Sequence, residues 1–257
     1  MPIEDTLYSS HSYRSGKWIE EEDPVIVEHQ ASVMVNSETW VMLMCTPTHL
    51  EALGVGFLFN EGVIRSASEV VSAHLCDDST IIDIWLDRSV ERPKQWRRTT
   101  GCSGGMTGVD IDYPVETVPP SGKIYSPENI IACNKAFNEE QPLYRRAGGV
   151  HSSALGDGKQ ILLRVEDVGR HNTIDKLAGR LLLEGTQIEP RTLFTTGRIS
   201  SEMLQKAARM QCEVIVSRTS PTSLSVEMAR QAGITLVGYA RGERFRVYAH
   251  NERIQLS

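Results

Sequence analysis

The second half of the chain alternates short apolar runs with segments of helical periodicity, and this alternation constrains the fold more than any other feature of the sequence. In order, the pattern predicts strand 149–155, turn 156–159, strand 161–165, helix 171–183, strand 192–195, helix 200–210, strand 214–217, helix 223–231, strand 234–238 and strand 245–249. The first two strands are joined by a tight turn, so we expect them to be antiparallel. Strands that are separated by helices need crossover connections, which favours a mixed sheet covered by helices on both faces.

The first half of the chain is richer in strands. An irregular polar segment to about residue 23 precedes predicted strands at 25–30, 31–35, 40–45 and 81–85, a helix that opens at 46–48 and ends near 60–62, and a further helix over 126–138. We therefore expect an α/β (α+β) protein in two parts. Residues 1–122 form a smaller β-rich N-terminal part with one helix and a cysteine loop at 99–108, and residues 123–257 form a mixed-sheet α/β domain.

The overall composition is that of a soluble globular protein, with 257 residues of which 40% are hydrophobic and 23% charged. A net charge of −6 argues against a general nucleic-acid binder, because nonspecific affinity comes from clustered lysine and arginine that neutralise phosphates. No apolar run approaches the roughly 20 residues that span a bilayer, and the polar start has no signal-peptide core. We expect a cytoplasmic protein that binds neither nucleic acid nor membrane.

The cysteines are odd in number and have no paired spacing, which suits a reducing compartment rather than a disulfide framework. They are Cys45, Cys76, Cys102, Cys133 and Cys212. Cys45, Cys133 and Cys212 lie in or beside predicted strands and helices, and Cys76 falls in a short polar transition. We expect these four to be small packed or inert side chains.

Cys102 differs because it lies in a loop of small residues, 99–108, where four glycines surround the thiol. Such a loop can hold the sulfur exposed and let the backbone of a partner approach closely. Arg97 and Arg98 would favour the reactive thiolate if they stay close to it. A plain flexible loop with an incidental cysteine is an equally good interpretation of the composition.

The segment 166–172 joins a predicted strand to a predicted helix and holds two carboxylates, a glycine, an arginine and a histidine. Helix N-termini offer unpaired N–H groups to anions, and ligands of open α/β sheets lie outside the carboxyl ends of the strands, so the segment predicts an anion site. The alternatives are structural. Glu166 and Asp167 would cap the helix and compensate its dipole, and the ring of His171 would bond Asp175 one turn later.

Three further turns follow predicted strands at the same edge of the sheet, and each combines arginine with hydroxyl groups or glycine. Such turns suit phosphate, although helix capping beside a solvated arginine is the usual explanation for any one of them. Together with segment 166–172 they predict a nucleotide-sized site. The candidate binding residues are Arg170, His171, Thr196, Arg198, Arg218, Tyr239, Ala240, Arg241, Gly242, Glu243 and Arg244.

Several of these segments resemble the formate dehydrogenase accessory protein family, the FdhD-type sulfurtransferases. The resemblance is carried by 145–155, by 164–176 with its Gly-Arg-His-Asn stretch, and by 48–62, 195–203, 217–222 and 238–241. It extends from about residue 20 to the C-terminus.

The resemblance implies a protein that takes sulfur from a cysteine desulfurase as a persulfide. It would pass the sulfur to the bis(molybdopterin guanine dinucleotide) cofactor of molybdenum or tungsten before that cofactor enters formate dehydrogenase. It also implies a C-terminal domain of cytidine-deaminase-like fold, a homodimer and binding of GDP-like ligands. By position, Cys102 matches the first cysteine of the family's Cys-x-x-Cys loop and would carry the persulfide, and segment 239–244 would bind the guanine dinucleotide.

One departure from the family pattern concerns the second cysteine of that loop, since the stretch here reads Cys102-Ser103-Gly104-Gly105. A two-cysteine relay through that pair is therefore impossible, whereas one exposed thiolate is sufficient to accept and release sulfur. The alternatives are a cofactor-binding chaperone, or a guanine-nucleotide-binding module, without sulfur transfer.

A zinc deaminase is the interpretation from another class, and the sequence argues against it. The pattern of a histidine and glutamate followed by Pro-Cys-x-x-Cys does not appear. His151 and His171 with Glu166 or Asp167 lack the tight spacing of metal ligands. We expect no metal site and no protein-bound zinc.

Overall fold

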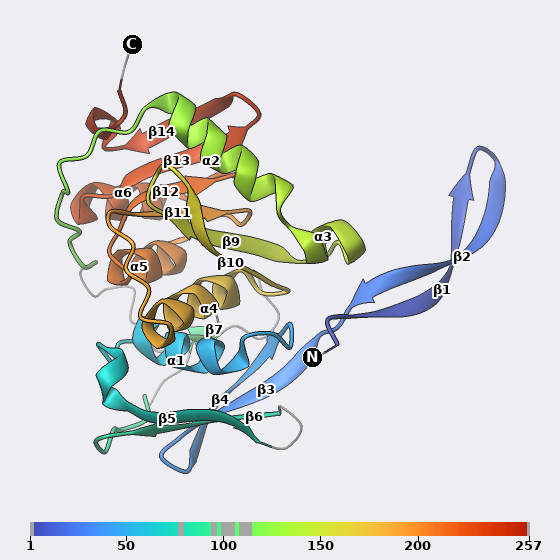
Figure 1. Cartoon of the computed structure of the whole chain (residues 1–257), viewed down its shortest axis with the longest axis horizontal. Helices are drawn as coiled ribbons and strands as arrows, with labels where there is room; N and C mark the ends of the chain where they lie inside the picture. The colour runs from blue at the N-terminus through green and yellow to red at the C-terminus, as the bar shows by residue number, and fades with distance from the viewer. Residues whose placement is uncertain (1–2, 77–79, 94–96, 99–105, 108–114, 256–257) are drawn as a thin grey trace.

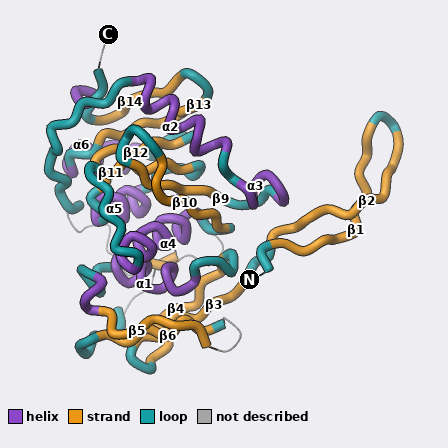
Figure 2. Tube along the Cα trace, viewed as in Figure 1, coloured by secondary structure: helices purple, strands orange, loops and turns teal. Residues whose placement is uncertain are grey.

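The protein is built around two β-sheets that face each other across a pair of helices (Figure 1). The structure is a computed structural model of the 257-residue chain and describes residues 3–76, 80–93, 97–98, 106–107 and 115–255, with the side chains of 94–114 outside that description. Strands, helices and loops follow each other along the whole described chain (Figure 2).

The larger sheet has six strands in the order β10-β9-β11-β12-β13-β14. These strands are β9 (His151–Gly156), β10 (Ile161–Asp167), β11 (Arg191–Thr195), β12 (Cys212–Ser217), β13 (Thr235–Arg241) and β14 (Arg244–Ala249). β11, β12 and β13 are parallel to one another, and the remaining pairs are antiparallel, including β9 with β10. The predicted mixed sheet and its antiparallel first pair are confirmed.

Helices cover both faces of this sheet. On one face, α4 (Arg170–Leu183), α5 (Ser201–Arg209) and α6 (Ser223–Ala232) share a core with the strands, in which Leu155, Leu193 and Leu236 are fully buried. On the other face, α2 (Pro127–Glu139) packs Phe137 against Phe194 of β11. α2 begins where Ser126 accepts a hydrogen bond from the amide of Asn129, with proline at the first helical position, as the sequence predicts.

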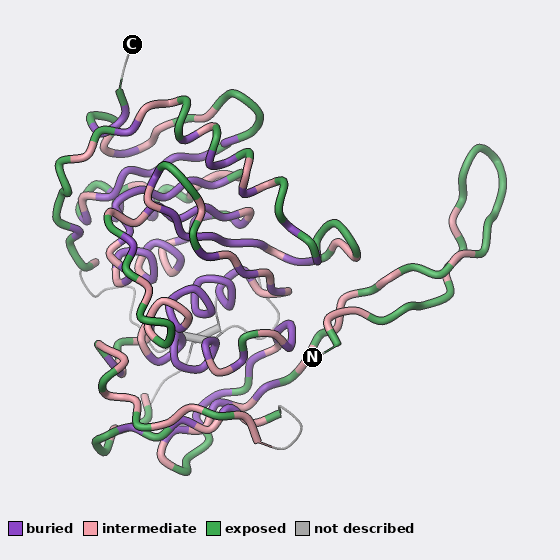
Figure 3. Tube along the Cα trace, viewed as in Figure 1, coloured by how far each residue is buried: buried purple, intermediate pink, exposed green. Residues whose placement is uncertain are grey.

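The smaller sheet has four strands in the order β4-β3-β6-β5, and α1 (Leu50–Asn60) lies between it and α4 (Figure 1). Its strands are β3 (His29–Val35), β4 (Glu38–Cys45), β5 (Val70–Cys76), which follows the short 3-10 helix η1 (Ala67–Glu69), and β6 (Ile81–Leu86). Because α1 is covered on both sides, it is apolar all round and nearly all of it is buried (Figure 3).

Two glycines let α1 and α4 approach each other backbone to backbone. A Cβ added at Gly56 of α1 would lie 1.8 Å from the carbonyl oxygen of Asp175, and one added at Gly179 of α4 would lie 1.8 Å from that of Ala52. Neither position leaves room for any side chain. The close packing of α1 on α4, which joins the two sheets, therefore depends on glycine at both places.

Residues 5–26 form a long hairpin arm, which corrects the expectation of an irregular segment there. β1 (Asp5–Arg14) and β2 (Lys17–Ile26) pair antiparallel over their full length, and the arm projects away from the rest of the molecule (Figure 1). Most of its side chains are exposed (Figure 3). Polar residues pair across the two strands without a buried face, so the arm lacks the apolar alternation by which strands are predicted.

Other boundaries also differ from expectation. Cys76 ends the edge strand β5 rather than lying in a polar transition, and the strand expected over 25–30 is split, because β2 ends at Ile26 and β3 begins at His29. The helix α3 (Pro142–Ala147) was not predicted, because its six residues are too few to show helical periodicity. The remaining elements are β7 (Arg97–Arg98), which pairs antiparallel with β8 (Met106–Thr107), and η2 (Asn251–Arg253). The boundary at 122 and the deaminase-like fold stay predictions.

Gly179→Ala is expected to lower the free energy of unfolding by about 3 kcal/mol, because the added methyl group must force the two helices apart. Chemical denaturation measures this. Gly185→Ala is the matched control: Gly185 has φ of +62° but open space around it, so only the backbone cost of about 1–2 kcal/mol applies. Equal losses in the two variants would contradict the close approach of the helices.

Candidate functional site

Asp167 and Lys176 form an ion pair that is closed to solvent at the start of α4. The Nζ atom of Lys176 lies 2.6 Å from Oδ2 of Asp167, and both side chains are 0% exposed. Asp167 also accepts hydrogen bonds from the amide of Gly169 at 2.7 Å, from the side-chain amide of Asn172 at 2.8 Å and from the amide of Thr46 at 3.0 Å. The carboxylate is thus satisfied entirely by protein groups.

The same pair fastens the chain segment before α1 to α4. Lys176 donates a hydrogen bond to the carbonyl oxygen of Thr46 at 2.9 Å, and the hydroxyl of Thr46 accepts one from the amide of Val168 at 3.1 Å. Asn172 donates to the carbonyl oxygen of Met44 at 2.8 Å. These bonds join residues more than a hundred positions apart, so Asp167, Val168 and Asn172 of segment 166–172 help to hold the two sheets together.

Glu166 has a capping role, although at a different helix from the one expected. Its carboxylate accepts hydrogen bonds from the amides of Leu143 and Tyr144, each at 2.9 Å. These amides belong to the first turn of α3, where an anion satisfies unpaired donors. Glu166 therefore positions α3, whereas Asp167 accepts hydrogen bonds at the start of α4.

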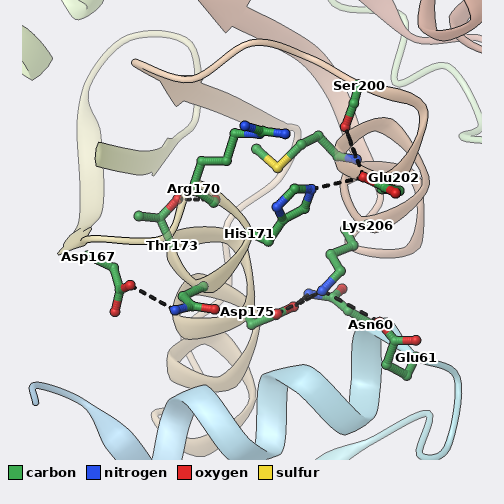
Figure 4. Close-up of polar contacts among 12 residues, drawn as sticks. Asn60, Glu61, Asp167, Arg170, His171, Thr173, Asp175, Ser200, Glu202 and Lys206 are labelled. Atoms are coloured by element: carbon green, nitrogen blue, oxygen red, sulfur yellow. Dashed lines mark hydrogen bonds and ion pairs between the residues drawn. The ribbon is translucent and has the colours of Figure 1, made fainter. Parts of the chain in front are cut away.

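Arg170 and His171 lie in the first turn of α4 (Figure 4). Both are buried, with exposures of 4% and 2%. The structural alternative, in which the ring of His171 bonds Asp175, is wrong. The Nε2 atom of His171 lies 3.2 Å from the carboxylate of Glu202 in α5, while Lys206 holds Asp175 at 2.7 and 2.8 Å. The contact across to α5 replaces the local one because Asp175 already neutralises a buried ammonium group.

The titration of this cluster follows from its burial. Burial lowers the pKa of His171 below its ordinary 6.5, against the opposite effect of its bond to Glu202, so the ring is neutral at neutral pH. With Nε2 donating to Glu202, Nδ1 is left as a buried acceptor that has no hydrogen-bond partner among the described residues. Burial alone would also lower the pKa of Lys206, but the charges of Asp175 and Glu61 raise it.

Hydroxyl groups line the edge of the sheet above α4. The hydroxyl of Ser153 lies 2.7 Å from that of Thr173 and donates to that of Thr195 at 3.0 Å. The hydroxyl of Thr196 accepts from the amide of Ser152 at 3.0 Å and lies 3.4 Å from Nδ1 of His151. Thr196 is half-buried and bonded within the protein, so it differs from the exposed arginines of the neighbouring turns.

The three predicted arginine turns do meet at one edge. They follow the carboxyl ends of the parallel strands β11, β12 and β13, and they are bonded to one another: the amide of Arg218 donates to the carbonyl oxygen of Thr195 at 3.1 Å, and that of Tyr239 to Thr219 at 3.0 Å. The exposed side chains at this edge include Arg198, Arg218, Arg241 and Arg244. The edge is therefore strongly cationic, as a phosphate site requires.

Segment 239–244 is a bulged hairpin rather than the simple turn expected. The β13–β14 register shifts between Gly238 and Arg241, and Tyr239 has a φ of +52°, which side chains rarely adopt. Bulges and strained residues of this kind re-aim side chains beside ligand sites. Here Tyr239 is turned outward under the guanidinium of Arg246, whose Cζ lies 5.0 Å from the ring centre.

Two hollows adjoin this hairpin. The larger, of about 530 Å³, lies between α2 and the hairpin and is lined by Arg218 and residues 240–243 together with side chains of α2. The smaller, of about 170 Å³, is lined by Tyr239, Arg241, Arg244, Phe245 and Arg246. The larger has the volume of a typical small-molecule site. Arg241 borders both, and its Nε donates to the carbonyl oxygen of Arg218 at 3.0 Å.

The predicted site residues thus fall into two groups. Arg218 and segment 239–244 line the hollows, whereas Arg170 and His171 lie beneath the sheet edge and line neither. The turn after β11 connects the groups, because a Cβ at Gly197 would lie 3.2 Å from the side chain of Arg170. Arg170 therefore supports the turn that presents Arg198.

Sequence reasoning missed the contribution of α2 to the larger hollow, which Asn134, Lys135 and Asn138 line. The side-chain amide of Asn134 donates to the carbonyl oxygen of Ala240 at 3.3 Å, although Asn134 is only 5% exposed. The sequence signal for this wall of the hollow is the pair Asn134 and Asn138, which lie four residues apart on one face of the predicted helix.

The described thiols are mostly unreactive. Burial raises the pKa of Cys45 and of Cys212 to about 12 and raises that of Cys133 as well, so these three are protonated. Cys76 is half-buried at the edge strand β5. Cys102 and most of the cysteine loop lie outside the described residues, between β7 and β8.

Comparison with known proteins decides the family. The chain matches the sequence model of the FdhD/NarQ family over residues 26–255. It belongs to that family. Curated relatives named sulfur carrier protein FdhD include those of Bacillus licheniformis, 34% identical over 251 residues, and of Bacillus subtilis, 35% identical over 249, each comparison covering 95% of both chains.

The architecture of this FdhD/NarQ family member is also that of a solved relative. The crystal structure of a putative formate dehydrogenase accessory protein from Desulfotalea psychrophila superposes with a TM-score of 0.84 at 30% identity, covering 98% of this chain and 100% of that one. The predicted family and the mixed α/β architecture are confirmed. Among the described residues, no helix is long and apolar enough to cross a membrane.

Proposed function

We propose that this protein is a sulfur carrier of formate dehydrogenase maturation, which receives sulfur as a persulfide on Cys102 and passes it to the bis(molybdopterin guanine dinucleotide) cofactor. The observation that supports this best is the cationic edge at β11–β13, beside a hollow of about 530 Å³, in a member of the FdhD/NarQ family. Relatives 34 and 35% identical carry the name sulfur carrier protein FdhD.

The edge offers the chemistry that a guanine dinucleotide needs. The guanidinium groups of Arg218, Arg241 and Arg244 are exposed to solvent. Each of them can bind two phosphate oxygens at once. The side chains of Asn138 and Lys135 supply further donors at the wall formed by α2. Tyr239, held outward by the bulge, offers a ring face to a base. In this proposal the cofactor is substrate and cargo, not a resident group.

The sulfur step requires one thiolate. The thiolate of Cys102 attacks the outer sulfur of the persulfide on a cysteine desulfurase, a new S–S bond forms, the old one breaks, and the desulfurase cysteine leaves as thiolate. Release of the sulfur as sulfide at the cofactor then takes up two electrons, which a thiol reductant supplies. No second loop cysteine is needed, consistent with Gly105 at that position.

Arg170 and His171 act in this scheme by positioning the binding edge. Arg170 packs under Gly197, and His171 holds Glu202 at the start of α5, so both fix the turn that carries Arg198. The proposed partners are a cysteine desulfurase, formate dehydrogenase and a second copy of the chain, in the cytoplasm.

Cys102→Ala is expected to abolish sulfur loading, because the described thiols of Cys45, Cys133 and Cys212 are buried and protonated. The measurement incubates the protein with a cysteine desulfurase and radiolabelled cysteine and counts the protein-bound label. Cys76→Ser, which removes the half-buried thiol of β5, is the control and keeps full labelling. Equal labelling of wild type and Cys102→Ala would leave a chaperone or nucleotide-binding module as the function.

Arg241→Ala and Arg244→Ala are each expected to weaken GDP binding by about 10-fold or more, because each removes a charged hydrogen bond of about 1.5–3 kcal/mol. Isothermal calorimetry with GDP and ADP measures affinity and base preference. Arg145→Ala, an exposed arginine of α3 away from this edge, is the control and leaves binding unchanged. Equal affinity for the two nucleotides would count against a guanine site.

A further inference from the structure

A histidine, a cysteine and an aspartate come together on the outer face of the smaller sheet, far in sequence from the proposed binding edge. They are His74 and Cys76 of β5 and Asp83 of β6, and their ligand atoms all lie within 4.8 Å of one another. The antiparallel register places His74 directly opposite Asp83, and Cys76 follows His74 by two positions. All three side chains therefore project from the same face of the sheet.

That face is the one turned away from α1. Ile82 and Ile84, the neighbours of Asp83 along β6, are fully buried and lie against Gly54 of α1. Asp83 is thus on the opposite side, beside the edge strand β5, where His74 is exposed and Cys76 half-buried. A small ion could reach the cluster from solvent.

The carboxylate of Asp83 is oriented but not saturated. Its Oδ2 accepts a hydrogen bond from the indole N–H of Trp85 at 3.0 Å, and Nε2 of His74 lies 3.6 Å from the same oxygen. Its Oδ1 is buried and has no hydrogen-bond partner among the described residues. A buried carboxylate oxygen without a partner is costly, and a cation would satisfy it.

We propose that His74, Cys76 and Asp83 bind a zinc ion, with an imidazole nitrogen, the thiolate and a carboxylate oxygen as ligands. Nitrogen, sulfur and oxygen ligands of this kind are typical of tetrahedral zinc, whose ligand atoms lie about 3.3–3.8 Å apart. The 3.6 Å between Nε2 of His74 and Oδ2 of Asp83 falls in that range. The indole N–H of Trp85 holds the carboxylate of Asp83 in place by a hydrogen bond, as groups around the ligands do at metal sites.

Three protein ligands leave a fourth position for water or another ligand. The thiolate is the form of cysteine that binds a metal ion. The ion would tie the edge strand β5 to β6. This site was not apparent in the sequence, because the ligands lie on two strands and the spacing matches no zinc motif.

The test uses full-length protein carrying Cys102→Ser, which removes a competing thiol. We expect one zinc ion per chain in competition with a chromophoric chelator, and a thiolate-to-metal charge-transfer band on adding cobalt(II). His74→Ala and Asp83→Asn each weaken zinc binding at least 10-fold, and Cys76→Ser abolishes the cobalt band. Asp83→Asn keeps the side-chain shape and an acceptor for Trp85, so its fold is retained, which circular dichroism checks.

His11→Ala, in the exposed β1–β2 arm, is the matched histidine control and keeps both the stoichiometry and the affinity. The proposal is overturned if the Cys102→Ser protein binds no zinc, or if His74→Ala binds it as tightly as its parent. A cobalt band that persists in Cys76→Ser also overturns it.

Discussion

The buried ion pair of Asp167 and Lys176 is the interaction on which the rest of the structure depends. Neither side chain is exposed, and backbone and side-chain groups of the protein satisfy both of them. Removing one partner from such a pair leaves a buried charge, at a cost of about 3–5 kcal/mol. Because Thr46 belongs to the segment between β4 and α1, the pair joins the smaller sheet to α4 and thereby to the larger one.

This constraint explains why several residues of segment 166–172 have structural rather than ligand-binding roles. Its acids and its asparagine hold the architecture, with Glu166 at α3 and Asp167 and Asn172 at the entry to α4. The groups that face solvent lie elsewhere, on the turns after β11, β12 and β13. Such a division is common in α/β proteins, because rigid elements position the loops that bind ligands.

The sequence predicted the larger sheet well, because its strands and helices have strong periodicity and their order implies crossovers. It also predicted that the turns of Arg198, Arg218 and Tyr239 share an edge, which follows from parallel strands. It could not predict what depends on contacts between distant residues. Asp167 meets Thr46 across 121 positions, and Glu166 caps a helix that precedes it in the chain.

Other features escaped prediction for local reasons. The β1–β2 arm has no buried face, so its strands carry no apolar alternation. The bulge at Tyr239 depends on the pairing of β13 with β14. His171 faces Glu202 because Asp175 is neutralised by Lys206, a partner 31 positions away. In each case the missing information is tertiary.

A double-mutant cycle in equilibrium unfolding tests the central role of the buried pair most directly. Asp167→Asn and Lys176→Met are each predicted to cost about 3–5 kcal/mol, and the double variant about 2 kcal/mol less than their sum, because removing both charges leaves no unpaired ion. Strictly additive losses, or single losses below about 1 kcal/mol, would contradict the account.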